Sequence, residues 1–225
     1  MRFSYFLFLI LCSTIVFGQD SKTTEDKDAA YTKTITTRAE KIVTTLSISD
    51  SFKAKQVIAT IANQYRDLNT VYAERDNELK KIKEQTLSKE EKDSATKKVE
   101  ATVTNKVSVL HNAFLKKLSL QLNPDQVTKV KDGLTYNVLH VTYDAYVDMI
   151  PSLTKEQKDQ IMAWLVEARE YAMDGESSDK KHWWFGKYKG RINNYLSAQG
   201  YNITKEREDW EKRIKQKQEA KQNQS

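Results

Sequence analysis

The sequence predicts an all-α fold, a single domain of about six or seven helices, and three observations support this. Only six glycines and two prolines occur in 225 residues, whereas a β-rich domain of this size needs many tight turns, which those residues supply. Apolar residues recur at intervals of three and four through most of the chain. Motifs typical of helix starts separate the periodic segments. The two longest apolar stripes are neighbours, which predicts a long antiparallel helical hairpin as the base of the fold.

The first 18 residues have the pattern of a secretory signal peptide. Arg2 precedes an apolar run from Phe3 to Phe17, and Val16 and Gly18 stand at the −3 and −1 positions of a cleavage site before Gln19. This run is shorter than the roughly 20 residues of a membrane span, and no later segment is apolar enough to be one. We therefore expect a periplasmic or secreted protein with no membrane span, cleaved near Gly18/Gln19.

Composition excludes several classes of function. The only cysteine, Cys12, lies in the predicted signal peptide, so the mature chain has neither a disulfide nor a thiolate metal ligand. Three scattered histidines show no metal-ligand spacing, and we expect no metal and no cofactor. The net charge is +6, or +5 without Arg2, and it is spread among 31 acidic residues. That argues against a nucleic-acid partner and allows an anionic ligand, while leaving the oligomeric state open.

The polar residues 19–30 predict a mobile linker, followed by a helical domain over 31–210. A first apolar stripe begins at Ile35 and ends at Leu46. The hairpin comes next, with one helix over about 50–84 and its partner over about 89–120. The apolar residues of its two stripes repeat at helical spacing, and among them are Val57, Ile61, Leu68, Val71, Ile82, Val103, Phe114 and Leu118.

Three helix starts contain a capping box, in which a side chain at the N-cap and another at the third helical position each bond the backbone of the other. These pairs are Ser88 with Glu91, Asn123 with Gln126 and Thr154 with Gln157. Pro124 occupies the first helical position, where its missing N–H is not needed. The leucine before each start also gives a spacing similar to the Leu-Thr-x-x-Gln segments of the periplasmic chaperone Spy.

After a helix over about 123–132, Gly133 and several β-branched residues weaken helical propensity, which predicts an irregular break near 133–141. A short helix over about 142–149 should stop at Pro151. The clearest amphipathic helix follows over 155–173. A helix over 178–198 should end at Gly200, and a polar helix from about Thr204 should fade into a frayed tail over 211–225.

The segment 180–195 combines aromatic rings, cations and amides more densely than any other. Aromatic faces bind sugar rings or cations, while Arg, Lys and Asn donate hydrogen bonds to hydroxyls and carboxylates. We expect a ligand surface here, with Tyr136 contributing from the break, and the alternative is that these side chains pack in the core. The ligand-binding candidates are Trp183, Trp184, Lys187, Tyr188, Arg191, Asn194 and Tyr136.

No catalytic residue is fixed by a motif, and three candidates carry suitable chemistry. His140 could transfer a proton near neutral pH, and Tyr143 lies beside it in a polar and aromatic stretch that extends from Tyr136 to Asp148. Glu167, three residues before Glu170, could belong to a carboxylate pair of the kind that glycosidases use. A lyase would instead combine His140 or Tyr143 with Arg191 neutralising a uronate.

Four stretches resemble the secreted bacterial family called domain of unknown function 3826, and the resemblance covers about 31–210. They are ANQYRDLN (62–69), KVKDGLTY (129–136), AWLVEARE (163–170) and FGKYKGRINNYL (185–196). The family has no agreed activity. The resemblance implies an exported protein of a bacterium that degrades pectin-like or algal polysaccharides. This chain has His140 where a proline is common in the family, which weighs against a catalytic role for that histidine.

Together these observations predict an exported accessory protein of polysaccharide utilisation that binds fragments of an anionic glycan, uronate-rich or sulfated. One alternative is a polysaccharide lyase or glycoside hydrolase of the same pathway. Another is a Spy-like periplasmic chaperone, whose hairpin would present a broad concave surface. The glycan hypotheses predict that the aromatic face and the break segment meet in one cleft.

Overall fold

The computed structural model describes residues 19–222, which form eight helices and contain no strand. The all-α, single-domain prediction is confirmed. The predicted signal peptide and the last three residues of the expected tail lie outside the described residues. The helices are α1 (Gln19–Thr44), α2 (Ser51–Glu84), α3 (Lys89–Gln121), α4 (Pro124–Leu134), α5 (Val138–Met149), α6 (Lys155–Ala172), α7 (Ser178–Ala198) and α8 (Ile203–Gln222).

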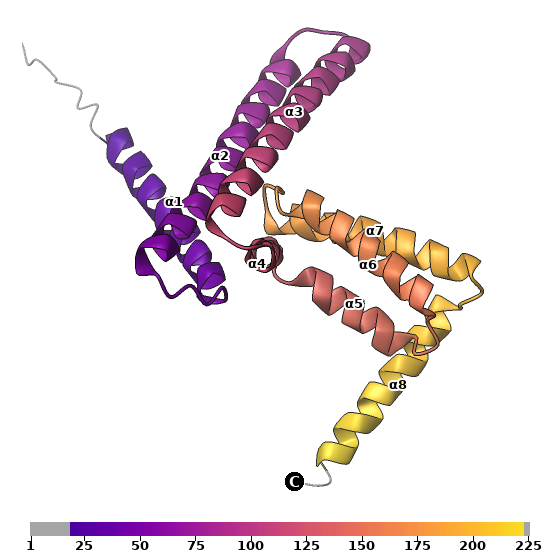
Figure 1. Ribbon diagram of the computed structural model, residues 1–225. Helices are drawn as coiled ribbons and strands as arrows, with labels where there is room; N and C mark the ends of the chain where they lie inside the picture. The colour runs from indigo at the N-terminus through magenta and orange to yellow at the C-terminus, as the bar shows by residue number, and fades with distance from the viewer. Residues whose placement is uncertain (1–18, 223–225) are drawn as a thin grey trace, which may run out of the picture.

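The helices pack around two hydrophobic cores. The first core joins α1, the start of α2, the end of α3 and α4, around Ile35, Ile61, Leu118 and Val130. The second core joins α5, α6 and α7, and α8 packs along its edge. Its centre is a stripe of buried residues along α6 and α7, made of Ile161, Leu165, Phe185, Ile192 and Leu196. Figure 1 shows α6 and α7 side by side, and α4, a helix of the first core, leads into α5 of the second. The junction of the two cores therefore lies where α4 ends.

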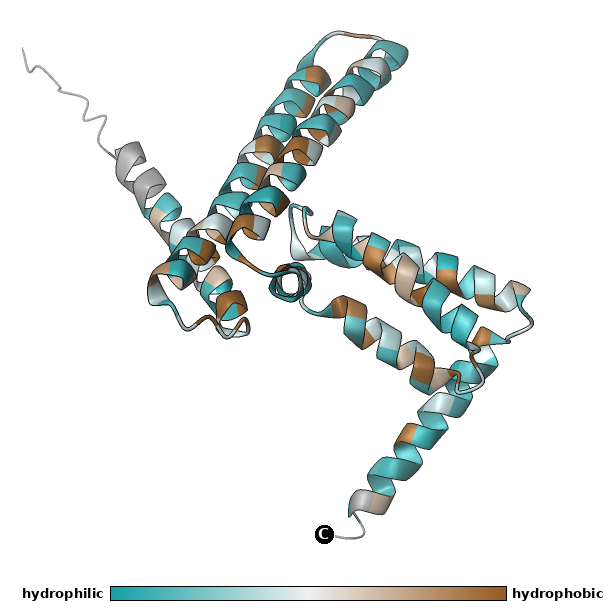
Figure 2. Ribbon diagram, in the orientation of Figure 1, coloured by the Kyte–Doolittle hydropathy of each residue, from teal (hydrophilic) through white to brown (hydrophobic). Residues whose placement is uncertain are grey.

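Helices α2 and α3 run side by side in opposite directions and extend away from the first core (Figure 1). Brown apolar segments alternate with teal polar ones along both helices in Figure 2. The outer half of the pair buries few side chains, among them Val71, Ile82 and Val103. The Lys106 ammonium there lies 2.7 Å from the Glu74 carboxylate. Charged side chains thus cover much of this outer half.

All three predicted capping boxes form, each with both of its bonds. The Asn123 side chain accepts from the backbone N–H of Gln126 at 2.9 Å, and the Gln126 side chain accepts from the N–H of Asn123 at 3.2 Å. Each box satisfies N–H groups that a helix start leaves free. These local bonds explain why the sequence locates the starts of α3, α4 and α6 to within a residue.

The predicted break is shorter than expected. Only residues 135–137 are non-helical, and α5 begins at Val138 rather than near Thr142. Leu139 is buried and Val138 packs against the second core, so tertiary contacts outweigh the low helical propensity of β-branched residues. The break is also a tight turn and not an extended segment, because Tyr136 and Asn137 both have left-handed backbone, with φ of 56° and 59°.

Both polar ends of the domain have helical backbone. Residues 19–30, for which the sequence predicts a linker, form the first turns of α1, and α8 continues to Gln222 through the predicted tail. Long polar side chains such as Lys, Glu and Gln are good helix formers in their own right. The eight helices of residues 19–222 exceed the expected total of six or seven, although each of them corresponds to one of the helical segments predicted above.

Gly133 and Gly186 provide a matched test of helix packing. A Cβ at Gly133 would lie 2.8 Å from Cγ1 of Ile42, whereas a Cβ at Gly186 would meet nothing within 4 Å. We predict that Gly133→Ala lowers the free energy of unfolding by roughly 1–3 kcal/mol through overpacking between α1 and α4. Gly186→Ala should raise it by up to about 1 kcal/mol through helix propensity. Urea unfolding checks both, and stabilisation by Gly133→Ala would contradict the close packing.

Candidate functional site

A groove between α6 and α7 gathers most of the predicted ligand-binding residues. Its volume is about 740 Å³, and we call it the α7 groove. Phe185, Ile192 and Leu196 are buried on one side of α7, which turns the other side outward. The lining residues come from both helices and are Glu167, Tyr171, Trp184, Lys187, Tyr188, Gly190, Arg191 and Asn194.

Two aromatic residues and a lysine, Tyr171, Trp184 and Lys187, lie together in the lining of this groove, and Trp183 lies next to them outside it. The rings of Tyr171 and Trp184 stack with centroids 4.6 Å apart, and the ring of Trp183 lies edge-on to Trp184 at 5.0 Å. The ammonium of Lys187 is 5.0 Å from the Trp184 ring and 5.8 Å from the Trp183 ring. Trp183 keeps 55% of its surface exposed and Tyr171 keeps 50%. The side chains of Trp183 and Tyr171 are therefore partly exposed to solvent beside a cation.

Arg191, Glu167 and Tyr188 also line the groove, and Tyr188 is buried in the second core. The Arg191 guanidinium lies 4.6 Å above the ring of Trp164 and 3.4 Å from the Glu167 carboxylate. Burial, and then the neighbouring Glu167, raise the pKa of the Tyr188 phenol well above its usual value. The phenol therefore stays neutral at physiological pH. Glu167 and Glu170 do not form a pair, because Glu170 contacts Lys131 and Arg169 instead.

Tyr136 and His140 lie in a different depression, so the predicted meeting of break segment and aromatic face does not occur. Tyr136 stacks on His182 at 5.9 Å, and Arg191 is nine residues further along α7, roughly 13 Å at the rise of an α-helix. Tyr143 packs against the second core. A lyase site made of this stretch opposite Arg191 is consequently not assembled.

This second depression, which we call the junction cleft, lies where the two cores meet and has a volume of about 610 Å³. Helix α1 and helix α4 form its walls, and the turn before α5 closes one end. It is lined by Arg38, Lys41, Ile42, Thr45, Tyr65, Lys129, Asp132, Gly133, Tyr136, Asn137 and His140. No residue that lines it also lines the α7 groove.

A buried ion pair fixes the position of Asp132, one of the residues that line the junction cleft. Arg169 of α6 and Asp132 of α4 are 7% and 8% exposed, and the guanidinium donates to the Asp132 carboxylate at 2.7 Å. The other oxygen of that carboxylate is 3.0 Å from Nε2 of His140. Glu170 accepts from Lys131 at 2.7 Å and from Arg169 at 3.2 Å. These contacts orient His140 and join α4 to α6.

Asp174, just after α6, carries a second set of buried contacts. Its carboxylate lies 2.6 Å from Nδ1 of His111 and accepts from the Gln64 amide at 3.3 Å, and its carbonyl accepts from the Tyr72 hydroxyl at 2.9 Å. The hydrogen bond that the Asp174 carboxylate accepts from the His111 ring raises the pKa of His111. The hairpin helices are thereby fixed to the end of α6.

Lys181 is buried at the same junction. It is 4% exposed, donates to the carbonyl of Leu134 at 2.8 Å, and its ammonium lies 5.2 Å from the Tyr65 ring. Burial lowers its pKa to about 8. Sequence reasoning missed Lys181, Asp132 and Arg169. A signal was present, because Lys181 lies four residues before the buried Phe185, on the apolar face of its helix.

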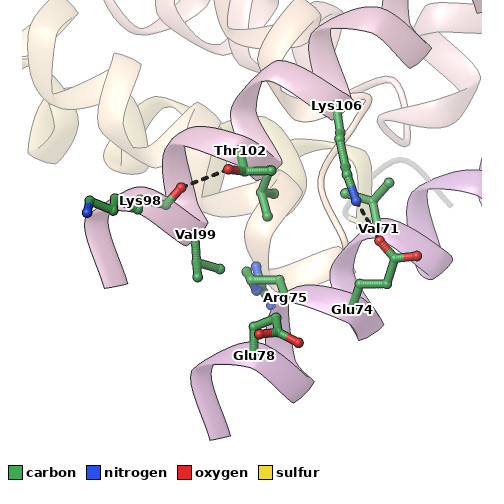
Figure 3. A pocket seen from close by; sticks show the side chains of 9 residues that line it. Val71, Glu74, Arg75, Glu78, Lys98, Val99, Thr102 and Lys106 are labelled. Atoms are coloured by element: carbon green, nitrogen blue, oxygen red, sulfur yellow. Dashed lines mark hydrogen bonds and ion pairs between the residues drawn. The ribbon is translucent and has the colours of Figure 1, made fainter. Parts of the chain in front are cut away.

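The flank of the hairpin has a third depression, of about 410 Å³ (Figure 3). Figure 3 shows Arg75 and Glu78 near Val99, and Lys106 directed at Glu74. Five of its nine lining residues are charged, namely Glu74, Arg75, Glu78, Lys98 and Lys106.

Among residues 19–222, no group of three or more potential ligands is placed to hold a metal ion. Over the same residues, no helix combines the length and apolarity that a bilayer crossing requires.

Residues 32–216 match the family described as "Protein of unknown function (DUF3826)". No curated protein matches the chain.

The contact between His111 and Asp174 predicts a pH-dependent stability. A raised pKa in the folded state means that the contribution is complete below the ordinary value of 6.5 and is lost as the pH rises through the folded value. We predict that the protein loses stability relative to a His111→Gln variant as the pH increases from 5 to 8. Urea unfolding at several pH values checks this, and parallel pH profiles for the two proteins would contradict it.

Proposed function

The chain belongs to the family described as "Protein of unknown function (DUF3826)", and we propose that it is an accessory protein of polysaccharide degradation that binds glycan fragments through the α7 groove. The observation that supports this most is the arrangement of Trp183, Trp184 and Tyr171 beside Lys187 and Arg191. Flat rings offer apolar faces to sugars, and the cations offer charge and hydrogen bonds.

The size and the rigidity of the α7 groove are both suited to binding an oligosaccharide fragment. Its volume of about 740 Å³ lies within the roughly 300–1,000 Å³ typical of small-molecule sites. Its walls belong to two helices that pack through the second core. Side chains on packed helices lose little freedom when a ligand binds, which favours affinity.

The charges favour an anionic glycan. Lys187 and Arg191 face one lining carboxylate, Glu167. The side chain of Arg191 is 54% exposed and its contact with Glu167 is long, at 3.4 Å. An exposed ion pair of this kind contributes little to stability, so a uronate carboxylate or a sulfate can replace Glu167 at low cost. We expect binding to weaken with increasing salt.

The place of action in this proposal is the periplasm or the cell exterior, and it rests on the signal-peptide pattern of residues 1–18. Polymeric glycans are substrates outside the cytoplasm. An open groove lined by rings and cations fits a binding role, in which the protein captures fragments for other proteins of the pathway.

A lyase or hydrolase is the second candidate, and the contact between His140 and Asp132 favours it. With Nε2 held by Asp132 at 3.0 Å, the other ring nitrogen of His140 is left to exchange a proton. Such an enzyme would act in the junction cleft rather than beside Arg191. Incubation with uronate-rich polysaccharide, followed by product analysis, tests this candidate, and His140→Gln is its control.

Binding to defined oligosaccharides tests the proposed function. We predict that calorimetry detects binding of oligogalacturonate, or of a sulfated algal oligosaccharide, at millimolar concentration or below. Trp183→Ala and Arg191→Gln should each weaken it by about tenfold, since each removes one charged or stacking contact. Phe52→Ala and Lys180→Gln, which alter an exposed ring and an exposed cation outside the groove, should leave it unchanged. No binding of any acidic glycan would reject the proposal, and so would equal losses in the control variants.

A further inference from the structure

We propose that the junction cleft is a separate binding site for a sugar acid, a ligand the size of one monosaccharide that carries a carboxylate. This site lies outside the α7 groove and shares no lining residue with it. The inference therefore goes beyond the proposed function, and each can fail without the other.

Unpaired cations around the cleft favour an anion. Arg38 and Lys41 extend from α1, and Lys129 extends from α4. Within residues 19–222, none of the three takes part in an ion pair. The lining carboxylate of Asp132 is already bound to Arg169 and His140. Three positive charges thus face one volume without a partner, and a carboxylate would relieve their mutual repulsion.

The remaining lining residues suit a sugar ring. Tyr65 and Tyr136 supply aromatic faces, while Thr45 and Asn137 supply a hydroxyl and an amide. Aromatic bodies with a few placed polar groups are typical of sites that orient a small ligand. The volume of about 610 Å³ is sufficient for one sugar with ordered water. An inorganic anion such as sulfate would contact only the cations. The rings of Tyr65 and Tyr136 and the Asn137 amide therefore predict tighter binding of a sugar acid than of sulfate.

Backbone strain is concentrated at the same place. Tyr136 and Asn137 are consecutive, and both have positive φ, at 56° and 59°. Asparagine tolerates left-handed backbone, but this conformation is a marked exception for a bulky ring such as that of Tyr136. Strain of this kind persists where the surrounding structure holds it, often at binding sites. Here it directs Tyr136 and Asn137 to the rim of the cleft, which a relaxed helical continuation from α4 into α5 would not do.

The cleft is also rigid before any ligand binds. Gly133 brings α4 so close to α1 that a Cβ would collide with Ile42, which fixes the distance between the cations of the two helices. Asp132 holds His140, and Lys181 holds the carbonyl of Leu134, one residue before the turn. A site whose groups are already in position loses less entropy on binding.

Calorimetry with glucuronate as the probe tests this inference, with glucose and inorganic sulfate as comparison ligands. We expect glucuronate to bind the full chain more tightly than either. Arg38→Gln combined with Lys129→Gln should weaken glucuronate binding by about tenfold or more, because charge-assisted bonds are lost. Lys33→Gln combined with Lys55→Gln, which removes two exposed cations outside the cleft, should not weaken it. Arg191→Gln should not change it either, which separates this site from the α7 groove.

A substitution in the turn that contains Tyr136 and Asn137 provides a second test of this site. Asn137→Gly relieves a left-handed residue and removes an amide, so we expect a higher Tm together with weaker glucuronate binding. A purely structural turn would change Tm and leave binding unaltered. Three results would overturn the inference. The first two are an affinity for glucose, or for sulfate, equal to that for glucuronate. The third is unchanged glucuronate binding in the variant that lacks Arg38 and Lys129, provided that circular dichroism shows an intact fold.

Discussion

The buried ion pair between Asp132 and Arg169 is the interaction on which the arrangement of this protein depends. It joins α4 of the first core to α6 of the second, with the guanidinium 2.7 Å from the carboxylate and both residues more than nine-tenths buried. Leaving one partner of such a pair unmatched costs roughly 3–5 kcal/mol, because a charge stays buried without compensation. The contacts of Asp174 with His111 and Gln64 connect the hairpin to the same helix. Polar contacts therefore determine how the two apolar cores are oriented.

Both candidate ligand surfaces depend on this orientation. Helix α7 begins at the junction, where Lys181 is buried and His182 stacks on Tyr136, and then carries Trp184, Lys187 and Arg191 outward along the second core. The junction cleft needs α1 and α4 to stay in register, and the α7 groove needs only α6 and α7. Disruption of the junction should thus affect the cleft directly, while the groove keeps its own support.

Much of the fold could be predicted from the sequence because its signals are local. Ser88, Asn123 and Thr154 start helices through bonds to residues three positions away. Helical spacing along α7 left open which of its faces turns outward, and the burial of Phe185, Ile192 and Leu196 in the second core decides it. The junction could not be predicted from the sequence at all. Asp132, Arg169 and Lys181 are far apart in sequence, and only tertiary packing brings them together. The left-handed turn at Tyr136 likewise depends on the packing of Leu139 and Leu134 in different cores, which no local pattern reports.

A double-mutant cycle on Asp132 and Arg169 tests this account most directly. Free energies of unfolding in urea would be measured for the protein, for Asp132→Asn, for Arg169→Met and for the combined variant. We predict that each single change destabilises strongly and that the combined change costs much less than their sum, with a coupling of about 2 kcal/mol or more. Additive losses would contradict the account, because they would show that the two side chains do not hold the cores together as a pair.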